Sequence, residues 1–201
     1  TLLNVPTLMR CAMKRFTSPI VAASLAIGLA GACANSTMIV DTDYRDSYDP
    51  LNFNLYHGNR DTRVSVIGDT LGTNSRNLST AVTKTMYGNH EGQRTNFTTN
   101  PGPSAEKNLH VIMAFNVEHN SYLCETGGKL ESKPTAGKTE LQGAWCWGNQ
   151  TQSYTLATAP STRPGDPAFK SLVAETTQEL FGPPEDNNPL LDDSSTDDTV
   201  P

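Results

Sequence analysis

Residues 109–117, LHVIMAFNV, give the strongest strand signal in the chain. Apolar side chains occupy both the odd and the even positions of this stretch, so both faces of the strand are expected to be buried. A strand of this kind needs a neighbour on each side and a layer above and below it. We therefore expect residues 109–117 to form a central strand, with the rest of the domain arranged around it.

Weaker strand patterns lie on both sides of this stretch. Residues 62–67 (TRVSVI) alternate, with Val64 and Val66 on one face, as in a half-buried strand. Further strands are predicted over residues 93–99, 140–147 and 152–158, the last two joined by a turn at Gly148-Asn149.

Two helices are predicted, each with a clear start and stop. The first covers residues 75–87, where Asn74 or Ser75 caps the start and Gly88 marks the end. The second begins at Asp166-Pro167 and stops at Gly182. This order of elements predicts an α+β fold, with a small, mainly antiparallel sheet and two helices packed on one face, in a single globular domain over residues 61–183.

The segments that flank this domain read differently. Residues 33–60 show no regular period and are interpreted as a tether or lead-in, part of which packs back on the domain through Tyr44, Tyr48, Phe53 and Tyr56. Residues 184–201 form an acidic tail that cannot bury enough apolar surface to fold, and we expect it to be disordered.

The charge of the chain excludes one class of partner. The 201 residues include 15 Lys and Arg against 21 Asp and Glu, a net charge of -6, and six of those acids lie in the last 17 residues. Without the tail, 15 bases face 15 acids (21 − 6). No basic surplus remains to bind a phosphate backbone, so we expect no nucleic-acid partner.

The amino terminus resembles an export signal. Arg10, Lys14 and Arg15 form a basic cluster, and residues 16–32 (FTSPIVAASLAIGLAGA) carry no charge. A basic start, an apolar core and small residues at its end are typical of a secretory signal peptide, which we place within residues 1–32. A membrane-spanning anchor is the alternative, although the apolar run is shorter than the ~20 residues a span needs. Met9 or Met13 would make a more typical start than Thr1.

The sequence Leu-Ala-Gly-Ala-Cys at residues 29–33 resembles the signal of bacterial lipoproteins. The resemblance implies that the signal is cut before Cys33 and that this cysteine carries the lipid, with palmitate among its acyl chains, which anchors the protein in a membrane. Leucine usually stands three residues before that cysteine, and here Ala30 takes this place. Ala30-Gly31-Ala32 also fits an ordinary signal-peptidase site, which would release a soluble periplasmic or secreted protein. Ala34 is similar to the pattern of lipoproteins sent to an outer membrane.

The four cysteines agree with export. Cys11 would leave with the signal and Cys33 would carry the lipid, so Cys124 and Cys146 remain. In an oxidising compartment this pair is expected to form a disulfide. The loop of 21 residues between them (146 − 124 − 1) would add about 3 kcal/mol of stability. A redox-active dithiol is the alternative, but such pairs are usually spaced as C-x-x-C.

Residues that suggest catalysis are few. His57, His90, His110 and His119 are scattered without metal-ligand spacing, and no cofactor-binding motif is present, so we expect neither metal nor cofactor. Residues 64–71 (VSVIGDTL) resemble the first block of GDSL-type hydrolases, in which a strand leads to Gly-Asp-Ser. Here the stretch is Gly68-Asp69-Thr70, and the family's closing Asp-x-x-His has no match.

These observations favour an exported cell-envelope protein that acts as a binding or structural module. The whole chain resembles small envelope lipoproteins of proteobacteria without an assigned activity, and this resemblance implies no catalytic residue. From the signal and Cys33 we expect periplasmic exposure, a membrane contact through the lipid and an envelope protein as a partner. The alternatives are a hydrolase using Asp69 and Thr70, with His90 or His110 as the base, and a thiol exchanger using the cysteine pair.

Overall fold

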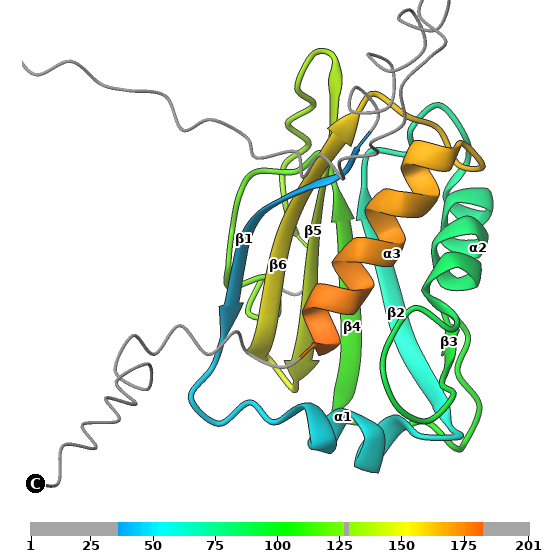
Figure 1. Cartoon of the computed structure of the whole chain (residues 1–201), viewed down its shortest axis with the longest axis vertical. Helices are drawn as coiled ribbons and strands as arrows, with labels where there is room; N and C mark the ends of the chain where they lie inside the picture. The colour runs from blue at the N-terminus through cyan, green and yellow to red at the C-terminus, as the bar shows by residue number, and fades with distance from the viewer. Residues whose placement is uncertain (1–35, 127–128, 183–201) are drawn as a thin grey trace, which may run out of the picture.

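The computed structural model describes residues 36–126 and 129–182. Within these residues the chain forms β1 (Met38–Tyr44), α1 (Pro50–His57), β2 (Asp61–Gly68), α2 (Ser75–Met86), β3 (Asn96–Thr98), β4 (Leu109–Phe115), β5 (Lys138–Trp147), β6 (Gln150–Pro160) and α3 (Pro167–Phe181). The strands of the described residues make one six-stranded sheet in the order β1-β6-β5-β4-β2-β3 (Figure 1).

The strand β4 lies inside the sheet, as its sequence predicts. It pairs with β5 on one side and β2 on the other, and six of its seven residues are buried. The strand is two residues shorter than expected because Asn116 turns into the left-handed region, with φ 48°. The Asn116 side chain then accepts from the Glu140 N–H and donates to Asp69, which fixes the start of the next loop.

The fold is α+β, but the prediction of a mainly antiparallel sheet with two helices is wrong. The sheet is mixed, because β2 runs parallel to both β3 and β4, whereas the pairs β4–β5, β5–β6 and β1–β6 are antiparallel. Helix α2 and the loop from β3 to β4 return the chain across the sheet, so β2, β3 and β4 all run in the same direction. The described residues also contain a third helix, α1.

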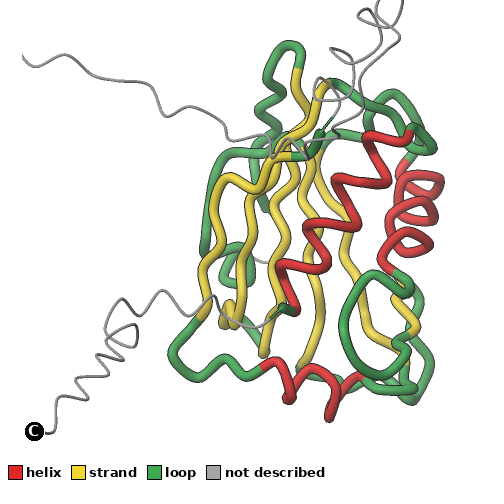
Figure 2. The backbone as a smooth tube through the Cα atoms, viewed as in Figure 1, coloured by secondary structure: helices red, strands yellow, loops and turns green. Residues whose placement is uncertain are grey.

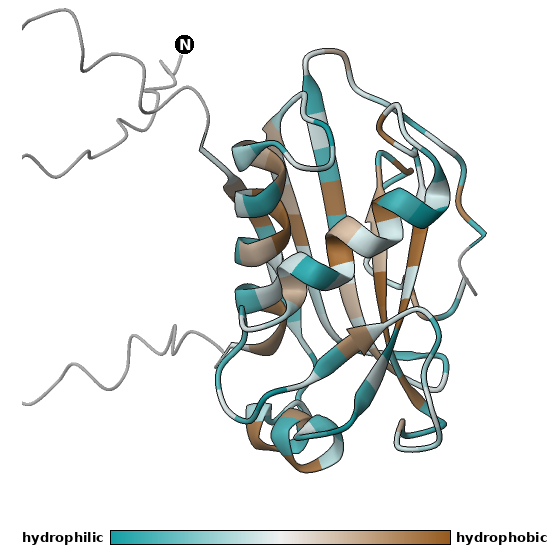
Figure 3. Ribbon diagram, turned by 90° about the vertical axis from the view of Figure 1, so that its right-hand side faces the viewer, coloured by the Kyte–Doolittle hydropathy of each residue, from teal (hydrophilic) through white to brown (hydrophobic). Residues whose placement is uncertain are grey.

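Helices α2 and α3 cover one face of the sheet, and α1 lies across its end (Figures 1 and 2). Figure 3 shows that α3, at its left, turns its hydrophobic side to the strands and its hydrophilic side outward. Phe169, Leu172, Val173 and Leu180 of α3 are buried, as are Leu78, Val82 and Met86 of α2. Of the two residues predicted to cap α2, Asn74 does so by accepting from the Asn77 N–H.

The interpretation of residues 33–60 as a tether is wrong over residues 38–57. Strand β1 pairs with β6 along its length, and α1 places Phe53 and His57 in the core. The expected packing of Tyr48 and Phe53 on the domain is confirmed, since both are buried. The sequence hides α1 because its apolar residues alternate at Leu51, Phe53 and Leu55, which is the period of a strand.

The predicted signal peptide (1–32), the proposed lipid acceptor Cys33 and the acidic tail (184–201) lie outside the described residues. Among the residues that are described, no helix has the length and apolar character to cross a membrane.

Candidate functional site

The predicted bridge between Cys124 and Cys146 is confirmed, with the two Cα atoms 5.6 Å apart. Cys146 lies on β5, and Cys124 lies in the connection between β4 and β5. Both side chains are buried in a small apolar cluster on the face of the sheet opposite α2 and α3, with Ile112, Ala144 and Leu123 among its members. The bridge therefore holds this connection over the second face of the sheet and gives the domain its third layer.

Gln142 supports the same connection from β5. Its buried side-chain amide donates to the carbonyl oxygens of Val117 and Glu118, and its oxygen accepts from the Asn120 N–H and the Tyr154 hydroxyl. A buried amide whose donors and acceptor are all used specifies one arrangement of its neighbours. The connection is thus positioned by polar contacts at its start and by the disulfide farther along.

Asp69 and Thr70, suggested as hydrolase residues, lie in the turn that ends β2. The Asp69 carboxylate accepts from the Leu71 N–H at 2.9 Å and from the Asn116 side chain at 3.0 Å. These bonds hold the turn, where Leu71 adopts a φ of 53°. The geometry gives Asp69 a structural role in closing a strand end.

The two histidines proposed as a base lie at the other end of β2. His110 on β4 pairs with Arg63, and His90 contacts Phe97, whose backbone pairs with Thr62. Six or seven strand residues separate these positions from Asp69, which is roughly 20 Å at ~3.3 Å per residue. The structure therefore does not bring Thr70 together with either histidine.

A buried histidine that the sequence did not single out occupies the core. His57 is fully buried, and its Nε2 accepts from the Trp145 indole N–H at 3.1 Å. An indole N–H can only donate, so the imidazole proton sits on Nδ1, which lies 2.7 Å from the Thr62 hydroxyl. Burial, with smaller contributions from the positive charges of Arg60 and His90, lowers the pKa of His57 to about 4.

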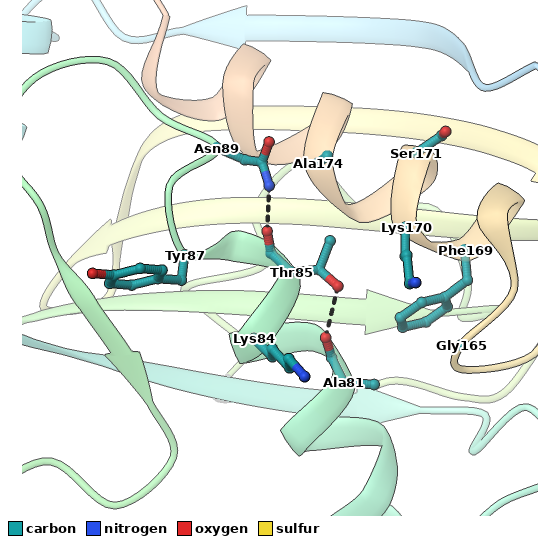
Figure 4. Close-up of a pocket in the computed structure, with 10 residues that line it drawn as sticks. All are labelled: Ala81, Lys84, Thr85, Tyr87, Asn89, Gly165, Phe169, Lys170, Ser171 and Ala174. Atoms are coloured by element: carbon teal, nitrogen blue, oxygen red, sulfur yellow. Dashed lines mark hydrogen bonds between the residues drawn. The ribbon is translucent and has the colours of Figure 1, made fainter.

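A hollow of about 690 Å³ lies between α2 and α3 (Figure 4). Helix α2 contributes Ala81, Lys84 and Thr85 to its walls, and α3 contributes Phe169, Lys170, Ser171 and Ala174. Phe169 is buried beneath the groove, whereas Tyr87 at its edge is half exposed. We call this hollow the α2/α3 groove; its size and largely apolar floor are typical of a binding site for a small molecule or an extended peptide.

Two cations stand at the α2/α3 groove. Lys84 and Lys170 come from opposite walls, and neither has an ion-pair partner among the residues that the structure describes. Thr85 and Asn89 cannot offer their full hydrogen-bonding capacity, because the Thr85 hydroxyl donates to Ala81 and the Asn89 amide is bonded to the Thr85 carbonyl (Figure 4). The groove thus combines an apolar floor with free positive charge, which suits an apolar ligand that carries acidic groups.

A second hollow of about 530 Å³ lies next to the groove, farther along α3, and shares Asn89 with it. Gln178, Glu179 and Gly182 form one wall, and residues 88–91 form the other. We call it the lower hollow. His90 lines it and holds an Nε2 atom that is buried without a hydrogen-bond partner.

The described residues also expose apolar side chains at the end of the sheet where α1 lies. Leu51 and Leu55, one turn apart on α1, are 71% and 69% exposed, and Trp147 at the end of β5 is 44% exposed. Tyr56 contacts Trp147 edge to face. We call these four residues the α1 patch.

No group of three or more His, Cys, Asp or Glu side chains suited to a metal ion occurs within residues 36–126 and 129–182. No protein-family model matches the chain, and comparisons with curated proteins and with solved structures find no match either.

The groove was not anticipated from the sequence. The helical periods of residues 75–87 and 167–181 place Lys84 and Lys170 outside the buried stripes, which is the only signal that the sequence offers. That the two lysines line one groove depends on the packing of α2 against α3, which local sequence pattern does not reveal.

Proposed function

We propose that this chain is an exported cell-envelope protein, anchored through a lipid on Cys33, whose domain acts by binding a partner protein in the α2/α3 groove. The observation that carries the proposal is the bridge between Cys124 and Cys146. Disulfides persist in oxidising compartments such as the periplasm and are rare in the cytosol. The bridge therefore supports the same compartment that the signal-like residues 1–32 suggest.

The position of the groove supports a role in binding. It combines an apolar floor with the side chains of Lys84 and Lys170. The hydrolase reading has less support, since Thr70 lies roughly 20 Å from the nearest suggested base, at ~3.3 Å per strand residue. A partner segment with apolar side chains and carboxylates would fit both the floor and the lysines.

The compartment and the anchor are tested by the intact mass of the mature protein, taken from membranes with and without reductant in denaturant. We expect a species that begins at Cys33, carries added acyl mass, and gains two hydrogens on reduction. A lipid-free species would overturn the anchor, and a reduced pair in freshly isolated protein would overturn the oxidising compartment.

The same bridge separates binding from thiol exchange. Cys146 is fully buried and Cys124 nearly so, so thiolate attack requires the connection to open first. We expect mild reductant to leave the bridge intact in the folded protein and to cleave it in denaturant. Rapid cleavage under native conditions would favour the thiol-exchange alternative.

The binding role is tested by a photoreactive residue placed at Ser171, on the wall of the groove, in cells that make the full chain. A matched probe at Lys129 lies in the β4–β5 connection, which covers the other face of the sheet. We expect one discrete adduct from Ser171, identified by mass spectrometry as an envelope protein, and its loss on Lys84→Glu/Lys170→Glu. Equal adducts from both probes, or none from Ser171, would contradict the groove as the binding surface.

A further inference from the structure

We propose that the acidic tail of this same chain, residues 183–201, occupies the α2/α3 groove and competes there with the partner. This inference rests on the proposed function, because it describes how the same groove is regulated. It draws on three features: where the tail begins, how far it reaches, and what chemistry it presents.

The tail begins beside the groove. Gly182 is the last described residue, and it lines the lower hollow at the end of α3. The lower hollow and the groove share Asn89, so the two hollows adjoin each other beside α3. Hydrogen bonds from the Tyr48 hydroxyl to the carbonyl of Gly182 and from Tyr44 to that of Glu179 hold this starting point in place.

The tail is long enough to return along α3. From Gly182 to Lys170 the helix covers 12 positions, or roughly 18 Å at 1.5 Å per residue. Residues 183–191 reach at most about 30 Å when extended, at ~3.3 Å per residue. The extended reach exceeds the distance, so Leu190 and Leu191 can lie beside the groove.

The chemistry of the tail matches the groove at that level. Pro189, Leu190 and Leu191 are followed at once by Asp192 and Asp193. The leucines fit the apolar floor over Phe169, and the two aspartates reach the unpaired Lys84 and Lys170. Exposed ion pairs contribute little each, so the apolar contacts and the short covalent link carry most of the binding.

The lower hollow contributes less. Glu91 and Glu179 line it, and the first acids of the tail, Glu185 and Asp186, pass the same region. Like charges at this point disfavour close contact. We therefore place the contact of the tail in the groove itself, between Leu190 and Asp193.

The test uses a zero-length carbodiimide reagent on the full mature protein, which joins a lysine to a carboxylate only where the two touch. We expect links from Lys84 and Lys170 to Asp192 or Asp193 at least fivefold above links from Lys129 and Lys133, which are also exposed but lie in the β4–β5 connection. High salt should lower this excess, because screening weakens exposed charge pairs. Equal labelling of all four lysines would overturn the proposal.

Two tail variants sharpen the result without touching the described domain. Leu190→Ser/Leu191→Ser keeps both aspartates but removes the apolar contacts, and we expect its links to Lys84 and Lys170 to fall to the level of the control lysines. Asp197→Asn/Asp198→Asn removes two charges beyond the groove and should leave those links within twofold. The reverse pattern would show that net charge alone draws the tail to the domain, and it would overturn the proposal.

The two proposals fail in distinguishable ways. A partner captured at Ser171, together with equal labelling of the lysines, would leave the binding role intact and remove the tail from the groove. The opposite result is links between the tail and the two lysines in the wild type, with no partner adduct at Ser171 in either the wild type or Leu190→Ser/Leu191→Ser. That result would support the tail in the groove and overturn the binding of a partner. If both proposals hold, that variant should increase the partner adduct.

Discussion

At the scale of single residues, the core depends on polar side chains whose hydrogen bonds are completed inside the domain. His57 stands between Trp145 and Thr62, and Gln142 bonds to four groups around the start of the β4–β5 connection. A buried polar group that loses its partner costs about 1–3 kcal/mol, so these side chains restrict the core to one arrangement. Neither role can be predicted from sequence, because every partner except Thr62 lies 12 or more positions away along the chain.

The lowered pKa of His57 predicts how stability depends on pH. The folded state keeps the imidazole neutral down to a pKa of about 4, whereas the unfolded chain takes up a proton near the ordinary value of 6.5. Below pH 6.5 the unfolded state therefore binds more protons than the folded state. The unfolding free energy should fall by about 3 kcal/mol between pH 6.5 and pH 4 because of this group alone.

The measurement is denaturant unfolding over that pH range for the wild type and for His57→Gln. The variant should be less stable at pH 7 but should show a flatter pH profile. His110→Gln serves as the control: burial and the charge of Arg63 lower the pKa of His110 too, but this side chain is only partly buried. A profile for His57→Gln as steep as that of the wild type would contradict the prediction.

At the scale of elements, the sequence predicts the helices and strands in which the spacing of apolar residues matches the positions that the fold buries. Strand β4 and the helices α2 and α3 carry apolar residues wherever the fold buries them. Residues 50–57 alternate like a strand yet form a helix, because the cap of Asp49 on the Leu51 N–H and the ring of Phe53 outweigh the pattern. Strand β1 is an edge strand that leaves Met38 and Val40 exposed beside Asp41 and Asp43, so it lacks the long apolar run that revealed β4.

The place of α1 in the core can be tested within one helix. Phe53 is 1% exposed and stacks on Phe181 of α3, with ring centroids 3.9 Å apart. We expect Phe53→Ala to lower the unfolding free energy by about 3–5 kcal/mol, since it removes a buried ring and leaves a cavity. Leu55→Ala is the matched control in the same helix and should change stability by less than ~0.5 kcal/mol. Similar small effects for both would mean that residues 50–57 do not belong to the core.

The close packing of α3 on the sheet depends on one glycine. A Cβ atom added at Gly143 of β5 would lie 2.9 Å from Thr176 Cγ2, which is too close for two carbon atoms. Thr176 is buried and its hydroxyl donates to the Leu172 carbonyl, so its side chain cannot turn away easily. Gly143→Ala should therefore displace α3 and lower the unfolding free energy by about 1–3 kcal/mol.

A double-mutant cycle identifies the cause of that loss. Thr176→Ser removes the clashing methyl group and keeps the hydroxyl. In this background, Gly143→Ala should lower the unfolding free energy by no more than half as much as it does in the wild type. Denaturant unfolding of the four proteins measures the coupling. Strictly additive effects would show that contact with the methyl group of Thr176 is not the cause of the lost stability.

At the scale of the whole molecule, the sheet separates the two ends of the domain. Strand β1 begins at one end, and α1 lies at the other (Figure 1). The seven residues of β1 span about 23 Å at ~3.3 Å per residue. Cys33 precedes Met38 by five positions (38 − 33), which reach at most about 18 Å. A lipid on Cys33 would therefore place the start of β1 toward the membrane and direct the exposed leucines of the α1 patch away from it.

This orientation makes a prediction for two variants of the full chain. Cys33→Ala removes the thiol that would be acylated, so the protein should move from the membrane fraction to the soluble fraction. Leu51→Ser/Leu55→Ser removes the most exposed apolar side chains of α1, which are far from the anchor, and should remain with the membrane like the wild type. Fractionation followed by quantitative detection measures both, and unfolding curves should show that the double variant keeps its stability to within about 0.5 kcal/mol. Release of Leu51→Ser/Leu55→Ser into the soluble fraction would mean that α1 itself contacts the bilayer, and the domain would then have to lie with its α1 end toward the membrane.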